Sequence, residues 1–236
     1  MWLGVILLRD RMTPSHVESR REGLSEIMEF FDSVELEPAN LPNPKSPRSN
    51  ALAPRTMFIP KRLPNDRLIT GNESIRVAIT SFECWPNNIT LEFSMYFRTP
   101  PENYADCLLY ADGQSAIGHV RSLNQPRLAC IFSDGRYATN LRAPGFPRPH
   151  DRGLSEMYPV ISVVSSGGGG GGSSTSGYWR HVQRIDMWPL PSGGLFTIIF
   201  DWPAKNIKPA RLEFDGDQIR EACKYSVDIW GASIVD

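Results

Sequence analysis

Between residues 88 and 98 apolar and polar side chains alternate without a break, and this pattern constrains the fold more than any other in the chain. The apolar side chains occupy every second position: Ile89, Leu91, Phe93, Met95 and Phe97. Successive side chains of a β-strand point to opposite faces, so the segment is predicted to be a strand with one buried face and one wet face.

Seven more segments have strand character and are separated by turn signals such as Asp112-Gly113, Asp134-Gly135 and Ser192-Gly193-Gly194. They cover residues 74–82, 127–133, 135–140, 158–165, 178–187, 195–202 and 209–214. Many short strands without intervening helices predict an antiparallel β-sandwich. With 236 residues, 41% of them apolar, the chain can bury a large core.

One helix is predicted at each end of the chain. Residues 14–33 place apolar side chains at helical spacing behind Thr13 and Pro14, a favourable helix start. At the other end Asp215 is predicted to cap a helix whose apolar stripe would be Ile219, Ala222, Cys223, Val227 and Trp230. This second helix is expected to pack on the sheet.

The resulting domain prediction has three parts. Residues 1–37 form a loosely attached helical appendage, residues 38–69 a proline-rich linker, and residues 70–236 the sandwich with its C-terminal helix. Met12 directly precedes the helix start, so translation from Met1 and from Met12 are both considered.

Six consecutive glycines, Gly167–Gly172, interrupt the strand pattern. A P-loop would need Gly-Lys-Ser/Thr opening a helix, which is not found here, so a phosphate cradle is disfavoured. The tract is interpreted as a mobile surface loop, with a backbone contact surface as the alternative. In that alternative the contact residues would be Gly169, Gly170, Tyr178, Trp179 and Trp188.

Three Trp-Pro dipeptides, at Trp85, Trp188 and Trp202, lie near strand boundaries. A proline ends ladder pairing and an indole can cover the end of a core, so these tryptophans are predicted to be structural. Tryptophans exposed on a sandwich could instead stack on sugar rings, which leaves a carbohydrate-binding or carbohydrate-processing protein as the second interpretation of function.

The sequence offers no catalytic, cofactor or metal signature. It lacks a Gly-x-Ser-x-Gly elbow and a papain-like cysteine context, and its histidines have no metal-ligand spacing. Cys84, Cys107, Cys130 and Cys223 are widely spaced and are predicted to be buried free thiols, which suits the cytoplasm. We therefore expect no cofactor, no metal and no catalytic residue.

The charge balance bears on the class of partner. Twenty-five basic and 26 acidic residues give a formal charge of −1, which argues against non-specific binding to nucleic acid or anionic membranes. The apolar residues 1–8 lack a basic region before them and a cleavage site after them, so they are a poor signal peptide. A cytoplasmic protein is expected.

The order of several motifs provides one further clue. Trp85-Pro86-Asn87-Asn88 precedes the alternating strand, the glycine tract precedes Met187-Trp188-Pro189-Leu190-Pro191, and Asp201-Trp202-Pro203 precedes the terminal helix. In this order, residues 70–235 resemble a family of uncharacterised bacterial proteins. That family has no assigned activity, so the resemblance transfers no catalytic or binding residue. The sequence thus favours a non-enzymatic interaction or structural module, with another protein as its partner.

Overall fold

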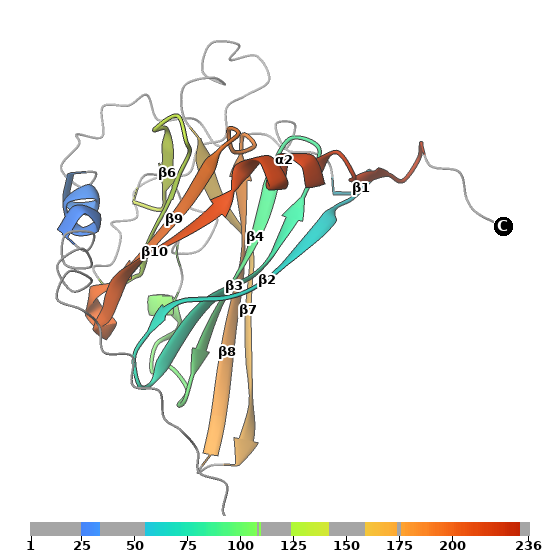
Figure 1. The fold of residues 1–236 in the computed structure, drawn as a ribbon. Helices are drawn as coiled ribbons and strands as arrows, with labels where there is room; N and C mark the ends of the chain where they lie inside the picture. Colours follow the sequence, from blue (N-terminus) through green and yellow to red (C-terminus); the bar gives the residue numbers. More distant parts are fainter. Residues whose placement is uncertain are drawn as a thin grey trace, which may run out of the picture.

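The structure is a computed structural model that describes residues 25–33, 55–107, 109, 124–141, 159–173 and 176–231. Two antiparallel sheets pack face to face in it, which confirms the predicted sandwich (Figure 1). The five-stranded sheet has the order β2 (Lys61–Gly71), β3 (Ile75–Cys84), β4 (Ile89–Phe97), β8 (Ser176–Trp188), β7 (Val160–Ser173). The four-stranded sheet has the order β10 (Ile207–Asp215), β9 (Leu195–Trp202), β5 (Arg127–Ile131), β6 (Tyr137–Thr139).

The smaller elements connect or extend these sheets. They are a short ribbon of β1 (Phe58–Ile59) and β11 (Val227–Asp228), the 3-10 turns η1 (Tyr104–Cys107) and η2 (Pro203–Lys205), and the helix α2 (Gly216–Cys223). Each of the eight predicted strand segments overlaps one of the observed strands. Strand pairing was therefore predictable wherever side chains alternate.

Large side chains of the two central strands fill the space between the sheets. The alternating residues of β4 are all buried, as predicted, and so are Phe196, Ile198, Phe200 and Trp202 of β9. The ring centroids of Phe93 and Phe200 lie 5.2 Å apart, and those of Phe97 and Trp202 lie 6.5 Å apart. Trp202 also donates its indole N–H to the carbonyl of Asn124, 2.7 Å away, so this indole is structural, as the sequence predicts.

The C-terminal helix begins where the sequence predicts and ends earlier. The Asp215 side chain accepts hydrogen bonds from the backbone N–H groups of Asp217 and Gln218, and Ile219, Ala222 and Cys223 are buried against the core. The prediction that Val227 and Trp230 continue the apolar stripe is wrong. The helix ends at Cys223, and both side chains are exposed beyond it.

Residues 25–33 form a helix, and residues 14–24 of the predicted helix lie outside the described residues. Its Ile27 and Phe31 are buried against Ala129 and Ile199, on the outer face of the four-stranded sheet. An apolar outer sheet face needs a cover, so the helix is held more firmly than the sequence suggests. No helix in the described part of the chain is long and apolar enough to cross a membrane.

Part of the predicted linker is strand. Residues 61–69 belong to β2, an edge strand, and Pro64 sits opposite Ser81 beside a shift in register. Proline lacks a ladder donor, and an edge strand tolerates it on the side that has no partner. The density of prolines between residues 38 and 64 hid this strand from the sequence pattern.

Candidate functional site

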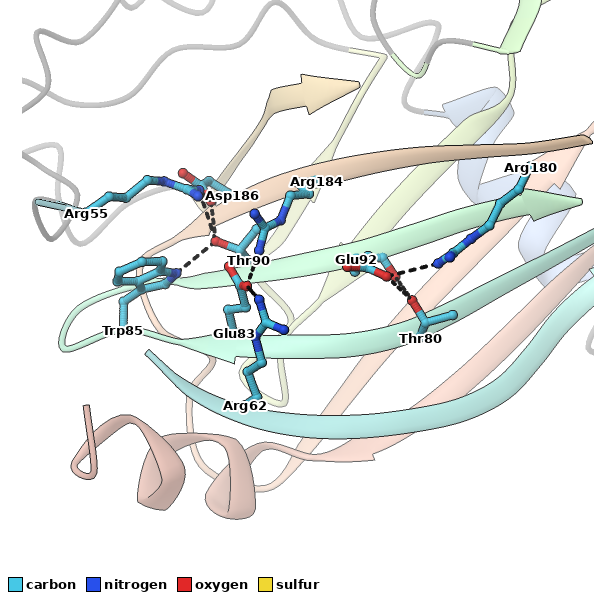
Figure 2. A network of polar contacts seen from close by, with 10 residues as sticks. All are labelled: Arg55, Arg62, Thr80, Glu83, Trp85, Thr90, Glu92, Arg180, Arg184 and Asp186. Atoms are coloured by element: carbon cyan, nitrogen blue, oxygen red, sulfur yellow. Dashed lines mark hydrogen bonds and ion pairs between the residues drawn. The ribbon is translucent and has the colours of Figure 1, made fainter. Parts of the chain in front are cut away.

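The outer face of the five-stranded sheet carries a network of charged and hydroxyl side chains (Figure 2). The strand register creates it, because Glu83 of β3 lies opposite Thr90 of β4, and Thr90 lies opposite Asp186 of β8. Two residue pairs further along β4 and β8, on the same face, Glu92 lies opposite Arg184. Residues from four strands, β2, β3, β4 and β8, and from the segment before β1 thus meet on one face.

The first group of contacts is centred on Asp186. Arg55 Nη2 lies 2.6 Å from Asp186 Oδ1, and the Thr90 hydroxyl donates to the same carboxylate oxygen. Trp85 Nε1 donates in turn to Thr90 Oγ1 over 2.9 Å, and the Arg55 guanidinium lies 5.2 Å from the Trp85 ring centroid. Trp85 is therefore a buried support of this group rather than a free stacking surface.

The second group is centred on Glu83. Arg62 Nη2 lies 2.8 Å from Glu83 Oε1, and Arg184 Nη2 contacts the same oxygen. Two guanidinium groups thus share one carboxylate. Both arginines have other nitrogens with no contact among the described residues, and the Nε of Arg184 is buried without an acceptor there.

A third group continues along β4. Arg180 Nη2 lies 3.1 Å from Glu92 Oε1 and 2.9 Å from Ser94 Oγ, and the Thr80 hydroxyl donates to Glu92 over 2.7 Å. These contacts explain why Thr90 and Ser94 are buried although the alternation predicts a wet face. Arginine side chains lie over them.

The charged groups of the network lie at different depths below the protein surface. The side chains of Glu83 and Asp186 are 4% and 1% exposed, whereas those of Arg62, Arg55 and Arg184 are 69%, 39% and 31% exposed. The carboxylates are at the bottom and the guanidinium groups are on top. We call the outward heads of Arg55, Arg62, Arg180 and Arg184 the arginine face; it presents positive charge to solvent on a chain that is nearly neutral.

A hollow of about 420 Å³ opens within this network. It is lined by Arg55, Ile59, Pro60, Arg62, Glu83, Trp85 and Arg184. Three guanidinium groups and one carboxylate line it, with two apolar side chains at one side. Such a lining can hold an anionic group attached to an apolar body.

A second surface adjoins the hollow at Ile59. Strand β1 pairs with β11 so that Ile59 lies opposite Val227, and the N–H of Ile229 donates to the carbonyl of Met57. Met57, Ile59, Val227 and Ile229 share one face by this register and are exposed, and Trp230 in the following turn is 78% exposed. We call these five residues the apolar ribbon. Sequence reasoning missed the apolar ribbon because Val227 and Trp230 continue the helical spacing of apolar residues and were assigned to the C-terminal helix, which ends at Cys223.

The glycine tract is not a loop. Gly167–Gly172 lie in β7 and pair with β8 from Val182 to Gly177, at the edge of the five-stranded sheet. The interpretation as a mobile surface loop is therefore wrong. The paired strands end in a hairpin that projects beyond the other strands (Figure 1).

The alternative contact residues are only partly brought together. Gly170 lies opposite Trp179, Gly169 opposite Arg180, and Tyr178 opposite Gly171. Trp188 is nine residues further along β8, about 30 Å away at strand spacing. Trp188 therefore does not belong to one surface with the other four residues.

Gly169 and Gly170 are neighbours in the strand, so they face opposite sides of the sheet and have different surroundings. A Cβ on Gly170 would lie 2.3 Å from Trp179 Cδ2, whereas a Cβ on Gly169 would meet no atom within 4 Å. None of these glycines has a positive φ, since among the described glycines only Gly135 and Gly194 do. Glycine at position 170 is thus required by the indole that lies over it.

We expect Gly170→Ala to lower the free energy of unfolding by about 1–3 kcal/mol, because the new methyl group must displace the Trp179 ring. Gly169→Ala is the matched control on the next residue. It should change stability by about 1 kcal/mol or less, with a favourable sign from the unfolded state. Urea unfolding of both variants measures the difference, and equal effects would contradict the packing described here.

The four cysteines differ in how readily their thiols ionise, and a hydrogen bond with Cys84 lowers the pKa of Cys223. All four are free and buried, as predicted. Burial raises the pKa of Cys130 to about 12 and that of Cys107 to about 11, and a hydrogen bond with Cys223 together with burial raises the pKa of Cys84. The thiolate needed for nucleophilic attack is thus disfavoured at these three positions. Burial also lowers the pKa of His181 below its usual value.

Comparison with models of known protein families gives no match, and comparison with curated proteins gives none either. Among the described residues, no group of three or more His, Cys, Asp or Glu side chains is placed to hold a metal ion. The candidate site within the described residues consists of the arginine face, the hollow and the apolar ribbon.

Proposed function

We propose that this chain is a non-enzymatic interaction module that binds another protein. The partner lies on the apolar ribbon and reaches the arginine face with an acidic segment. The observation that carries the proposal is the grouping of five exposed large apolar side chains beside outward guanidinium groups.

The composition of this surface supports a protein partner. Contiguous exposed apolar patches mark interaction sites on soluble proteins. Tryptophan, methionine and arginine are enriched in protein interfaces, and tryptophan and arginine are frequent hot spots. Trp230, Met57 and Arg62 supply these residue types within or next to the apolar ribbon.

Charge complementarity supports an acidic partner segment. The carboxylates of Glu83 and Asp186 are buried and already paired, so an approaching segment meets arginine heads first. Opposite charge on the partner speeds association and disfavours basic competitors.

A cytoplasmic location is part of the proposal. Four buried free thiols support it, because reducing compartments keep cysteines in this form.

The arrangement of the aromatic side chains supports a protein partner over a carbohydrate. A sugar-binding face would need several exposed rings side by side. Trp85 and Trp202 are buried, and the exposed rings of the described residues are spread over separate elements: Tyr96 on β4, Tyr178 at the start of β8, and Tyr225 and Trp230 before and after β11.

The test combines capture with quantitative binding. Proteins captured by the wild-type chain from its native cells are identified by mass spectrometry, and the partner is then purified and titrated. We expect Trp230→Ala to weaken binding about tenfold or more, as loss of a buried tryptophan anchor does. Leu195→Ala, at an exposed apolar position on β9 outside the apolar ribbon, should leave binding unchanged. Equal affinities of wild type and Trp230→Ala for every captured protein would refute the proposal.

A further inference from the structure

The hollow has more hydrogen-bond donors than its own carboxylate can use. Arg62 and Arg184 each contact Glu83 through one terminal nitrogen, and both contacts go to the same oxygen. A guanidinium has five N–H donors, so most donors of both groups have no acceptor among the described residues.

The buried Nε of Arg184 makes this surplus costly. It has no acceptor in the described part of the chain, although Arg184 lines the hollow. An unsatisfied buried donor costs about 1–3 kcal/mol, and more when the group is charged. A bound acceptor would remove that cost.

The balance of positive and negative side chains at the hollow also favours a bound anion. Asp186 compensates Arg55, and Glu83 compensates one of the two other arginines. One guanidinium charge in the hollow is thus uncompensated within the described residues. The exposed side chain of Arg62 can turn toward a ligand without disturbing the sheet.

We propose that the hollow binds a phosphate monoester group, held by Arg62 and Arg184 with Arg55 beside them. A carboxylate has two oxygens and matches the fork of one guanidinium, whereas the three terminal oxygens of a phosphate monoester can bridge two. The volume of about 420 Å³ exceeds what a phosphate fills, and Ile59 and Pro60 provide an apolar wall for the group that bears it. The phosphate is carried by a phosphorylated side chain of the partner, and this identification rests on the proposed function. That the hollow binds a phosphate group does not rest on it.

The test follows the arginine side chains directly. Sodium phosphate at pH 7.5 is titrated into the ¹⁵N-labelled full chain, and the arginine Nε–Hε resonances are recorded at constant ionic strength. We expect a saturable shift of the Arg184 resonance, assigned by its loss in Arg184→Lys. Sodium acetate should give a shift at least about tenfold weaker in apparent affinity, because acetate offers the two guanidinium groups fewer acceptor oxygens and less negative charge than phosphate.

A variant pair separates the site from general charge. Arg62→Gln should weaken phosphate binding about tenfold, whereas Arg211→Gln should not change it. Arg211 is also exposed and ion-paired with a glutamate, Glu213, but lies on β10 of the other sheet. Binding of glycerol phosphate, a phosphate monoester, should weaken between pH 7.5 and pH 5, since a monoester loses its second charge near pH 6. A missing Arg184 shift, equal affinity for acetate, or equal loss in both variants would overturn the inference.

Two further probes identify the source of the phosphate. A short peptide with one phosphoserine between apolar residues should bind at least about tenfold more tightly than glycerol phosphate, because only the peptide can also cover the apolar ribbon. The reverse order would overturn a protein source while keeping the phosphate site. Partner binding that depends on Trp230 without any phosphate binding would overturn this inference alone. Phosphate binding with an unimportant Trp230 would overturn the proposed function alone.

Discussion

Arg127→Met should lower the free energy of unfolding by about 3–5 kcal/mol, because it removes the guanidinium that is ion-paired with the buried carboxylate of Asp201. Arg127 also lies 4.8 Å from the ring centroid of Phe31 and 3.7 Å from a carboxylate oxygen of Asp32. The same change therefore loosens the helix over residues 25–33 from the four-stranded sheet. Denaturant unfolding followed by circular dichroism measures the loss.

Two companion variants make this result specific. Arg127→Met combined with Asp201→Leu should recover most of the lost stability, since an apolar pair replaces a buried ion pair at little cost. Arg211→Met, which breaks the exposed ion pair with Glu213, should cost about 1 kcal/mol or less. A single variant Arg127→Met as stable as wild type would show that Asp201 is not held by this arginine.

Phe93→Ala should cost about 3–5 kcal/mol through the cavity that it leaves between the sheets. Phe93 is 1% exposed and packs on Phe200 of the opposite sheet. Tyr96→Ala is the matched control on the same strand, because Tyr96 lies on the outer face and is 37% exposed. It should cost about 1 kcal/mol or less, and a reversal of this order in thermal unfolding would contradict the assignment of faces.

The sequence predicted the fold wherever side chains alternate and could not predict it where they do not. The alternation in β4 and the helix cap at Asp215 each depend on residues close together in the sequence, so both could be predicted from it. Strand β2 contains Pro64 and depends on pairing with β3, and the glycines of β7 have low strand propensity by themselves. Both strands exist because the next strand along the chain pairs with them, a cause that their own residues do not show.

The candidate site depends even more on long-range contacts. Arg55 and Arg62 come from the proline-rich segment, whereas Glu83, Thr90 and Asp186 come from three different strands. Their meeting follows from strand order and register, which the sequence pattern does not contain.

The edge strand β7 has a consequence for how the length of the chain can vary. Its glycines are identical, so a shift of two residues along β8 places another glycine beneath Trp179 and restores the same surface. The register is instead fixed at the other end, where Val160 pairs with Trp188 and Ile161 with Met187. With the register held there, a gain or loss of two glycines changes the length of the paired strands by one residue pair, about 3.3 Å, whereas a single added glycine must be accommodated as a bulge. Natural length variants of this tract are therefore expected to differ by even numbers of glycines.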